Sequence, residues 1–427
     1  MKTITDMIKD VPIPKMVKVR ELYDNFHIPK EEIAQTVQNE LAREALSGQI
    51  KPGMQIAITC GSRGIHHYAI MTRAIVDFVK SKGAKPFIVS AMGSHGGATA
   101  EGQTQILADY GITEETMGCP VKSSMETVQI GLSNVRHQPV YVDKYASEAD
   151  GILLFNRIKP HTSFRGRYES GLMKMMAIGL GKQHGAESIH HQSPGIMHEL
   201  VEEYGRTILE NCPILGGIAI IENAYDETYL IRGLSPEEII TEEPKLRDLS
   251  YKTIARLLFD KCDVLVVDKI GKNISGDGMD PNISGRFVQP KYCSGGIEAE
   301  KVVILDLTDE THGNAQGVGL AEVTTRRLFN KMKLEMTYPT GVTNTFLHLM
   351  KIPMIMDNDR EALQLALCCC PDAEDQENMK MIRIPDTAHI EYIEISEALI
   401  PLAKANPHIE ILSEPYELPF DEEGNLF

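Results

Sequence analysis

The chain has 427 residues, more than one hydrophobic core usually organises, so two α/β domains are expected. Its 60 acidic and 43 basic residues give a net charge of −17, which argues against a nucleic-acid partner because such partners require clustered Lys and Arg. No apolar run of about 18 residues and no signal-peptide core are visible, so a cytoplasmic protein without a membrane segment is expected. The eight cysteines lack CxxC spacing and are interpreted as reduced, buried thiols, with a structural zinc site as the second interpretation.

A strand, loop and helix unit occurs twice in the first part of the chain. Residues 54–60 (MQIAITC) are an apolar run, GSRG interrupts it, and residues 65–83 have helical periodicity. Residues 85–91 (KPFIVSA) predict the next strand, followed by the loop MGSHGGAT and a helix over residues 100–111. This βαβ repetition predicts a Rossmann-like, mostly parallel sheet with right-handed crossovers.

A further strand is predicted over residues 151–158 (GILLFNRI), and it runs into the loop KPHT. Three loops marked by glycine or proline therefore follow the carboxyl ends of predicted strands, and they carry Arg63, His95 and His161. Because ligands bind at this edge of open parallel sheets, these side chains are expected to converge on one site. The structural alternative for His95 is a loop histidine satisfied by a backbone hydrogen bond.

Two more candidates lie in the segment that follows. Lys174 is surrounded by apolar and small residues (GLMKMMAIGLG), where desolvation lowers the pKa of a lysine amine. Such a lysine is a nucleophile or an attachment point, and a lysine that snorkels from a core helix is the alternative. Ser193 and Pro194 are expected to start a helix, which places His190 in the preceding loop.

The second half of the chain has its own strands and glycine-rich loops. Strands are predicted over residues 263–271 and 302–307. The domain boundary is placed near residues 255–262, on a predicted helix IARLLF. Residues 1–260 are therefore expected to form an N-terminal catalytic and cofactor-binding domain, and residues 261–427 a C-terminal α/β domain. The active site is expected in the cleft between them.

Several patterns fail as known motifs. GLGKQHG has the wrong glycine spacing for a nicotinamide-binding fingerprint and lacks the residues of a phosphate-binding P-loop. HExxH is absent, so a zincin mechanism has no support. His184, His191 and His198 recur every seven residues, but a proline interrupts the helix that would align them, so they are expected mostly to face solvent.

The order of these motifs resembles the lactate racemase family of nickel-pincer 2-hydroxyacid racemases and epimerases: SRG, GSHGG and KPHTSFRG after three strands, then GLMK and a histidine. The resemblance implies that His95 and His161 are the two acid/base histidines and that Arg63 binds the substrate carboxylate. It implies that Lys174 carries the nickel-pincer nucleotide, pyridinium-3,5-bisthiocarboxylic acid mononucleotide with nickel, as a thioamide. It also implies that His190 completes the coordination of the nickel.

Some assignments stay open within this resemblance. His191 is the alternative to His190 as the metal ligand, and Lys182 is the weaker alternative to Lys174. The family's Asp-x-Thr-Arg-Pro loop is CGSRG here, so the acid and the proline are missing and the identity of the substrate acid is open. The family's C-terminal substrate-binding lysine and glutamine are not placed, and the candidates for this role are Lys272, Asp277, His312 and Asn314.

The resemblance implies an isomerase that racemises or epimerises a 2-hydroxyacid by proton-coupled hydride transfer to the tethered cofactor. Its partners would be a small-molecule acid and the enzymes that make the pincer cofactor, and a homodimer is left open. Two other functions are weighed against it. One is a lyase or hydrolase that binds a divalent metal through His95, His190 and His191 without the pincer. The other is a non-catalytic hydroxyacid-binding protein.

Overall fold

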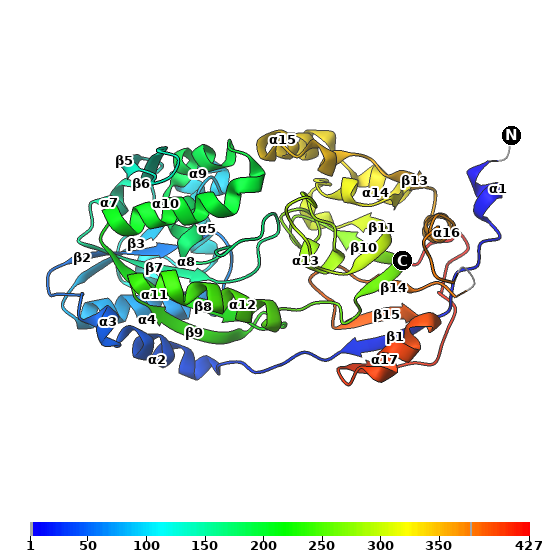
Figure 1. Cartoon of the computed structure of the whole chain (residues 1–427), viewed down its shortest axis with the longest axis horizontal. Coiled ribbons are helices and arrows are strands. Elements are labelled where there is room, and N and C mark those ends of the chain that lie inside the picture. The colour runs from blue at the N-terminus through cyan, green and yellow to red at the C-terminus, as the bar shows by residue number, and fades with distance from the viewer. Residues whose placement is uncertain (1–2, 376–377) are drawn as a thin grey trace. The chain divides into compact units, whose positions relative to one another are not determined.

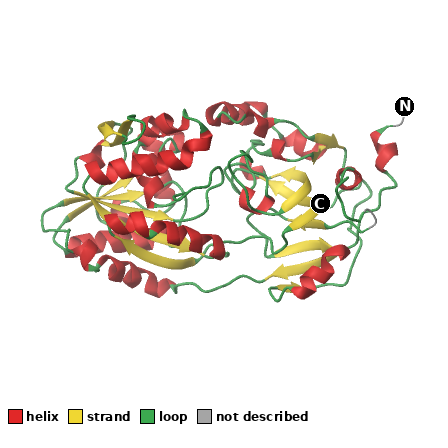
Figure 2. Cartoon of the chain, in the orientation of Figure 1, coloured by secondary structure: helices red, strands yellow, loops and turns green. Residues whose placement is uncertain are grey.

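The computed structural model describes residues 3–375 and 378–427, with His190, Pro194, Thr343 and Asn344 described by their backbone alone. The chain divides into two compact units. We call Asp24–Ile254 the central unit, and Met1–Tyr23 together with Ala255–Phe427 the terminal unit. Helices and strands alternate in both units, so the predicted mixed α/β class is confirmed (Figures 1 and 2).

The expected division at residue 260 differs from this one at the N-terminus. Strand β1 (Met16–Glu21) pairs antiparallel with β15 (Tyr392–Ser396) and β16 (Ile409–Ile411), which makes the first residues part of the terminal unit. The predicted helix IARLLF is wrong. Helix α12 ends before it, and the segment has no helical turn because Leu257 and Phe259, two positions apart, both enter the terminal unit's core in extended chain.

The central unit contains a six-stranded sheet in the order β4-β3-β2-β7-β8-β9. All neighbours are parallel except β9, which is antiparallel to β8. The strands predicted after the N-terminal segment are confirmed. The strands are β2 (Gln55–Cys60), β3 (Lys85–Ser90), β4 (Val121–Lys122), β7 (Gly151–Arg157), β8 (Ile214–Glu222) and β9 (Thr228–Leu234), with a separate hairpin of β5 (Thr127–Leu132) and β6 (Pro139–Asp143).

Strands β2 and β3 are buried at every position after the first, which is typical of parallel strands covered on both faces. Helices cover both faces of this sheet (Figure 1). They are α2 (Lys30–Leu41), α3 (Glu44–Ser47), α4 (Tyr68–Ser81), α5 (Ala100–Asp109), α6 (Glu114–Met117), α7 (Lys144–Ser147), α8 (Leu172–Lys174), α9 (Lys182–His190), α10 (Met197–Asn211), α11 (Pro236–Thr241) and α12 (Glu243–Thr253), with short 3₁₀ turns η1 (Gly96–Ala98) and η3 (Pro194–Ile196) and the π-helix η2 (Met175–Leu180).

The position predicted for His190 is wrong. Helix α9 includes His190 as its last residue, because Ala186 and Ile189 are buried and continue the apolar face of the helix up to that point. A 3₁₀ turn follows at Pro194, and α10 begins at Met197, three residues later than the Ser-Pro signal indicated.

The terminal unit contains an eight-stranded sheet in the order β13-β12-β11-β10-β14-β15-β1-β16, parallel from β13 to β14 and antiparallel beyond. Its other strands are β10 (Lys261–Ile270), β11 (Glu298–Leu307), β12 (Val323–Thr325), β13 (Met354–Met356) and β14 (Met381–Ile384). Its helices are α1 (Ile4–Ile8), α13 (Pro281–Ser284), α14 (Arg326–Lys331), α15 (Leu334–Asn344), α16 (Asp359–Cys368) and α17 (Ile400–Ala405), with 3₁₀ turns η4 (Asp309–Thr311), η5 (Val318–Leu320), η6 (Leu347–Met350) and η7 (Glu397–Leu399). None of the helices described in either unit is long and apolar enough to span a bilayer.

A buried ion pair lies behind the carboxyl end of β3. The Lys182 side chain is 0% exposed, and its Nζ lies 3.2 Å from Asp143 Oδ2. The same ammonium donates to Ser90 Oγ at 2.8 Å and to Gln103 Oε1 at 3.1 Å. Gln103 in turn donates to the carbonyl of His95 at 3.2 Å. The pair thus supports the loop after β3, and it makes Lys182 a structural residue.

We expect Lys182→Met to lower the free energy of unfolding by about 3 to 5 kcal/mol, because Asp143 would stay buried without its cation. Urea denaturation followed by far-UV circular dichroism measures the change. The control is Lys245→Met, because the exposed ion pair of Lys245 with Glu242 contributes less than about 1 kcal/mol. Equal changes in the two variants would contradict the assigned role of the buried pair.

Candidate functional site

Three loops of the central unit leave the same edge of its sheet. Strand β2 lies between β3 and β7, so the chain moves outward in opposite directions on the two sides of β2. Such a topological switch point opens a crevice at the carboxyl ends of the strands. Arg63 follows β2, His95 follows β3 and His161 follows β7. The structure therefore places these three residues on loops of neighbouring strands.

His95 lies on the loop after β3, and its side chain is exposed. Its Nδ1 is hydrogen-bonded to the hydroxyl of Ser62, which joins this loop to the loop of Arg63. Gly96 follows with φ of +68°, and a Cβ there would lie 2.8 Å from the backbone of Gly102. Glycine is therefore required for the tight turn that presents the imidazole.

The loop of His161 is closed at its base. The backbones of Lys159 and Ser170 exchange hydrogen bonds of 3.2 and 3.3 Å. Inside the loop, the carboxylate of Glu169 is 2% exposed and accepts the backbone N–H of His161 at 2.7 Å and the hydroxyl of Tyr251 at 2.9 Å. The His161 ring also stacks on Phe164, with 4.2 Å between ring centroids. The hydrogen bond to the backbone of His161 and the stacking on its ring thus fix the position of the imidazole.

His161 contacts Lys174 directly. The Nε2 atom of His161 lies 2.5 Å from Lys174 Nζ, and its Nδ1 accepts the backbone N–H of Ser163 at 3.0 Å. Burial, together with repulsion from Lys159 and Arg63, lowers the pKa of Lys174 to about 7. The structure thus brings Arg63, His161 and Lys174 together, with an amine that is partly neutral at physiological pH.

The helix that carries Lys174 begins on a buried acid. Glu243 is 1% exposed and accepts the backbone N–H of Met173 at 3.1 Å. A Cβ at Gly171 would collide with the Glu243 carboxyl, so this close approach requires glycine. Burial raises the pKa of Glu243 to about 8. Past Lys174 the chain continues as the π-helix η2, a form found frequently at functional sites.

Sequence reasoning missed four residues of this site: Lys159, Glu169, Tyr251 and Glu243. Lys159 is the first residue of the KPHT motif, and its place in that motif was the available signal for it. The other three act through buried hydrogen bonds between segments distant in sequence, and a single sequence does not record such pairs.

The structure places the other candidate metal ligands and the alternative lysine in different surroundings. The side chain of His190 lies outside the described residues, so its role as a nickel ligand stays a prediction. His184 and His191 are exposed and His198 is half-buried. Within the part of the chain that the structure describes, no three His, Cys, Asp or Glu side chains are grouped as a metal site. Lys182 is held in the buried network with Asp143, Ser90 and Gln103.

The terminal unit has a polar cluster at the carboxyl ends of β10 and β11. Lys272 Nζ donates to Gln316 Oε1 at 2.7 Å, and Gln316 Nε2 donates to Asp277 Oδ1 at 2.8 Å. Asn314 Oδ1 accepts the backbone N–H of Gln316 at 3.1 Å, whereas His312 is exposed on the same loop. The structure therefore joins three of the four predicted candidates through Gln316, which the sequence analysis did not identify.

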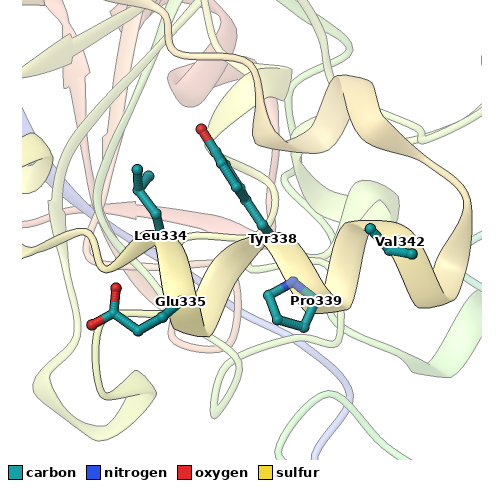
Figure 3. A pocket seen from close by; sticks show the side chains of 5 residues that line it. All are labelled: Leu334, Glu335, Tyr338, Pro339 and Val342. Atoms are coloured by element: carbon teal, nitrogen blue, oxygen red, sulfur yellow. The ribbon is translucent and has the colours of Figure 1, made fainter.

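A hollow elsewhere in the terminal unit lies along α15 (Figure 3). One helix supplies its walls, and apart from one carboxylate they are apolar or phenolic, so this hollow lacks the paired acid/base groups of the candidate site. The side chains that line it are Leu334, Glu335, Tyr338, Pro339 and Val342.

Glu243 makes the stability of the central unit depend on pH. Its pKa is about 8 in the folded chain against an ordinary value of 4.5, so between these values the folded state holds a proton that the unfolded state releases. The stabilising contribution is therefore complete below pH 4.5 and is lost as the pH rises to about 8. We expect the free energy of unfolding to fall by up to about 1.4 kcal/mol per pH unit relative to Glu243→Gln.

Glutamine keeps an acceptor for the Met173 N–H and does not titrate. Urea denaturation of both proteins at several pH values measures the difference. Parallel pH profiles for the wild-type chain and Glu243→Gln would show that Glu243 is ionised in the folded state.

Comparison with known proteins agrees with this fold. Residues 5–199 match the family model described as the lactate racemase N-terminal domain, a segment that contains Arg63, His95, His161, Lys174 and His190. The lactate racemase apoprotein from Thermoanaerobacterium thermosaccharolyticum has a similar fold, with a TM-score of 0.53 and 14% identity over 87% of this chain and 99% of that chain. No curated protein sequence matches the chain. Residues 5–199 thus match the lactate racemase N-terminal domain, and the resemblance found in the sequence is confirmed.

Proposed function

We propose that the chain is a racemase or epimerase of a 2-hydroxyacid that works with a nickel-pincer nucleotide attached to Lys174. The observation that carries this proposal is the Lys174 amine, which lies 2.5 Å from His161 Nε2 and has its pKa lowered to about 7. Attachment through a thioamide requires a neutral amine, and a lysine with an ordinary pKa near 10.4 offers almost none at neutral pH. Lys174 lies within the segment that matches the lactate racemase domain.

The surroundings of Lys174 fit an anionic nucleotide. Arg63 and Lys159 lie close enough to repel the protonated amine, and the same charges would attract a phosphate or a carboxylate. His190 is the proposed nickel ligand, since imidazole and sulfur donors suit nickel. When bound, the cofactor would supply an electrophilic carbon that accepts the α-hydrogen with its electron pair.

The roles of the protein side chains follow from the charge of the substrate. Removing the α-proton of a 2-hydroxy carboxylate would create a dianion, so loss of that hydrogen with its electrons is easier. Arg63 would hold the carboxylate by two hydrogen bonds. His95 and His161 would each take the hydroxyl proton of one enantiomer, and once the planar 2-keto acid has presented its other face, the opposite histidine would donate a proton to the ketone oxygen.

The terminal unit contains a hydrogen-bonded pair of lysine and glutamine side chains. Lys272 and Gln316 are hydrogen-bonded at 2.7 Å on loops that follow neighbouring parallel strands. Both side chains donate hydrogen bonds, as recognition of a hydroxyl or carboxylate requires. Lys272 and Gln316 are therefore the candidates in the terminal unit for the lysine and glutamine that the resemblance leaves unplaced.

We expect protein made together with the pincer-synthesis enzymes to racemise or epimerise at least one acid in a panel of enantiopure 2-hydroxyacids. His95→Ala and His161→Ala should each lower the rate by about 10²- to 10⁴-fold, the usual contribution of a positioned acid or base. Chiral chromatography measures the rate. In D₂O the product should keep the α-hydrogen of the substrate.

The control is His184→Ala, because His184 is exposed and contacts Tyr141 and Thr127 instead of Lys174. Full activity in His95→Ala or His161→Ala would contradict the two-base scheme. Deuterium at the α-carbon of the product would contradict hydrogen transfer to the cofactor and indicate proton abstraction.

A further inference from the structure

The hydrogen bonds of His161 determine which of its ring nitrogens carries a proton. A backbone N–H is always a donor, and the N–H of Ser163 points to His161 Nδ1 at 3.0 Å, so Nδ1 must present a lone pair. A neutral imidazole with a lone pair on Nδ1 carries its hydrogen on Nε2. The Nε2–H group then faces Lys174 Nζ at 2.5 Å.

Only the neutral form of the Lys174 amine can form a hydrogen bond with this Nε2–H group. An ammonium group has three donors and no lone pair, so it would set N–H against N–H at this distance. A neutral amine accepts the Nε2 hydrogen through its lone pair. The charges that act on Lys174 favour the same state, since Lys159 and Arg63 disfavour the ammonium ion. Glu169 opposes them, but its carboxylate is engaged by the His161 N–H and the Tyr251 hydroxyl.

We propose that His161 is a positioning residue for Lys174 in the unloaded chain, where its Nε2–H holds the lysine as a neutral amine, and that acylation of Lys174 releases His161 to act on substrate. This inference rests on the proposed function. An acylated amine has its nitrogen lone pair delocalised into the carbonyl or thiocarbonyl group, so it no longer accepts the Nε2 hydrogen. The unloaded chain therefore keeps one of its proposed bases occupied until the attachment is made.

Acylation by a small probe tests the first half of the proposal without the cofactor. The probe is the N-hydroxysuccinimide ester of acetic acid, whose carbonyl is attacked by the neutral amine. An amide forms, N-hydroxysuccinimide leaves and the amine gives up one proton. Peptide mass spectrometry of unloaded protein, labelled between pH 6 and 10, follows Lys174 against the exposed Lys245 as an internal reference.

We expect the labelling rate of Lys174 to reach half its maximum near pH 7. His161→Ala should slow the labelling of Lys174 at pH 7 by about fivefold, because the neutral amine loses its hydrogen-bond donor and its pKa rises by about one unit, while burial, Lys159 and Arg63 still act on it. His161→Gln should restore it, since an amide N–H can replace the Nε2–H donor. His184→Ala is the matched control and should label like the wild-type chain, because His184 contacts Tyr141 and Thr127 instead of Lys174. Unchanged labelling in His161→Ala would overturn the proposal.

A second measurement on the wild-type chain needs no variant. Long-range ¹H–¹⁵N NMR spectra distinguish the two histidine tautomers, and His161 should carry its hydrogen on Nε2 before acetylation. After Lys174 is acetylated, the Nε2 hydrogen should exchange with solvent faster. A hydrogen on Nδ1, or no change on acetylation, would overturn the proposal. Failure of the proposed function can be distinguished from failure of this inference. In that case Lys174 would be acetylated as expected, but no cofactor adduct would form on it.

Discussion

A lysine amine that is withdrawn from water beside two other cations is costly to protonate, and the arrangement around Lys174 depends on this constraint. Burial, Lys159 and Arg63 together lower its pKa to about 7, and the 2.5 Å contact with His161 fits the neutral amine. The chain thus presents a nucleophilic amine at the edge of a parallel sheet, where α/β proteins usually bind ligands. The same positive charges that disfavour the ammonium ion would attract an anionic cofactor or substrate.

Buried groups hold Lys174, His161 and the loop of His95 in place. Glu243 accepts a backbone N–H at the start of the helix that carries Lys174, and Glu169 accepts the backbone N–H of His161. The Lys182 network supports the loop of His95 through Gln103. Each anchor is nearly inaccessible to water, and a hydrogen bond in such a low-dielectric environment is stronger than at the surface. A site built in this way is ordered before any ligand arrives, which lowers the entropy cost of binding.

Local pattern was sufficient to predict much of this architecture. Apolar runs bounded by glycine place β2, β3 and β7, and with them the loops of Arg63, His95 and His161. The sequence is less informative where distant segments meet. Nothing in it pairs Glu243 with the helix of Lys174, and β1 joins strands that follow it by several hundred residues. The same limit explains why Gln316 was missed, since its role depends on two loops from neighbouring strands.

The most direct test of the account is peptide mass spectrometry with nickel analysis on protein produced together with the pincer-synthesis enzymes. The account predicts a cofactor adduct on the peptide that contains Lys174, with nickel bound in comparable amount, and no adduct in Lys174→Arg. An unmodified Lys174, in cells where a known lactate racemase becomes loaded, would contradict the account.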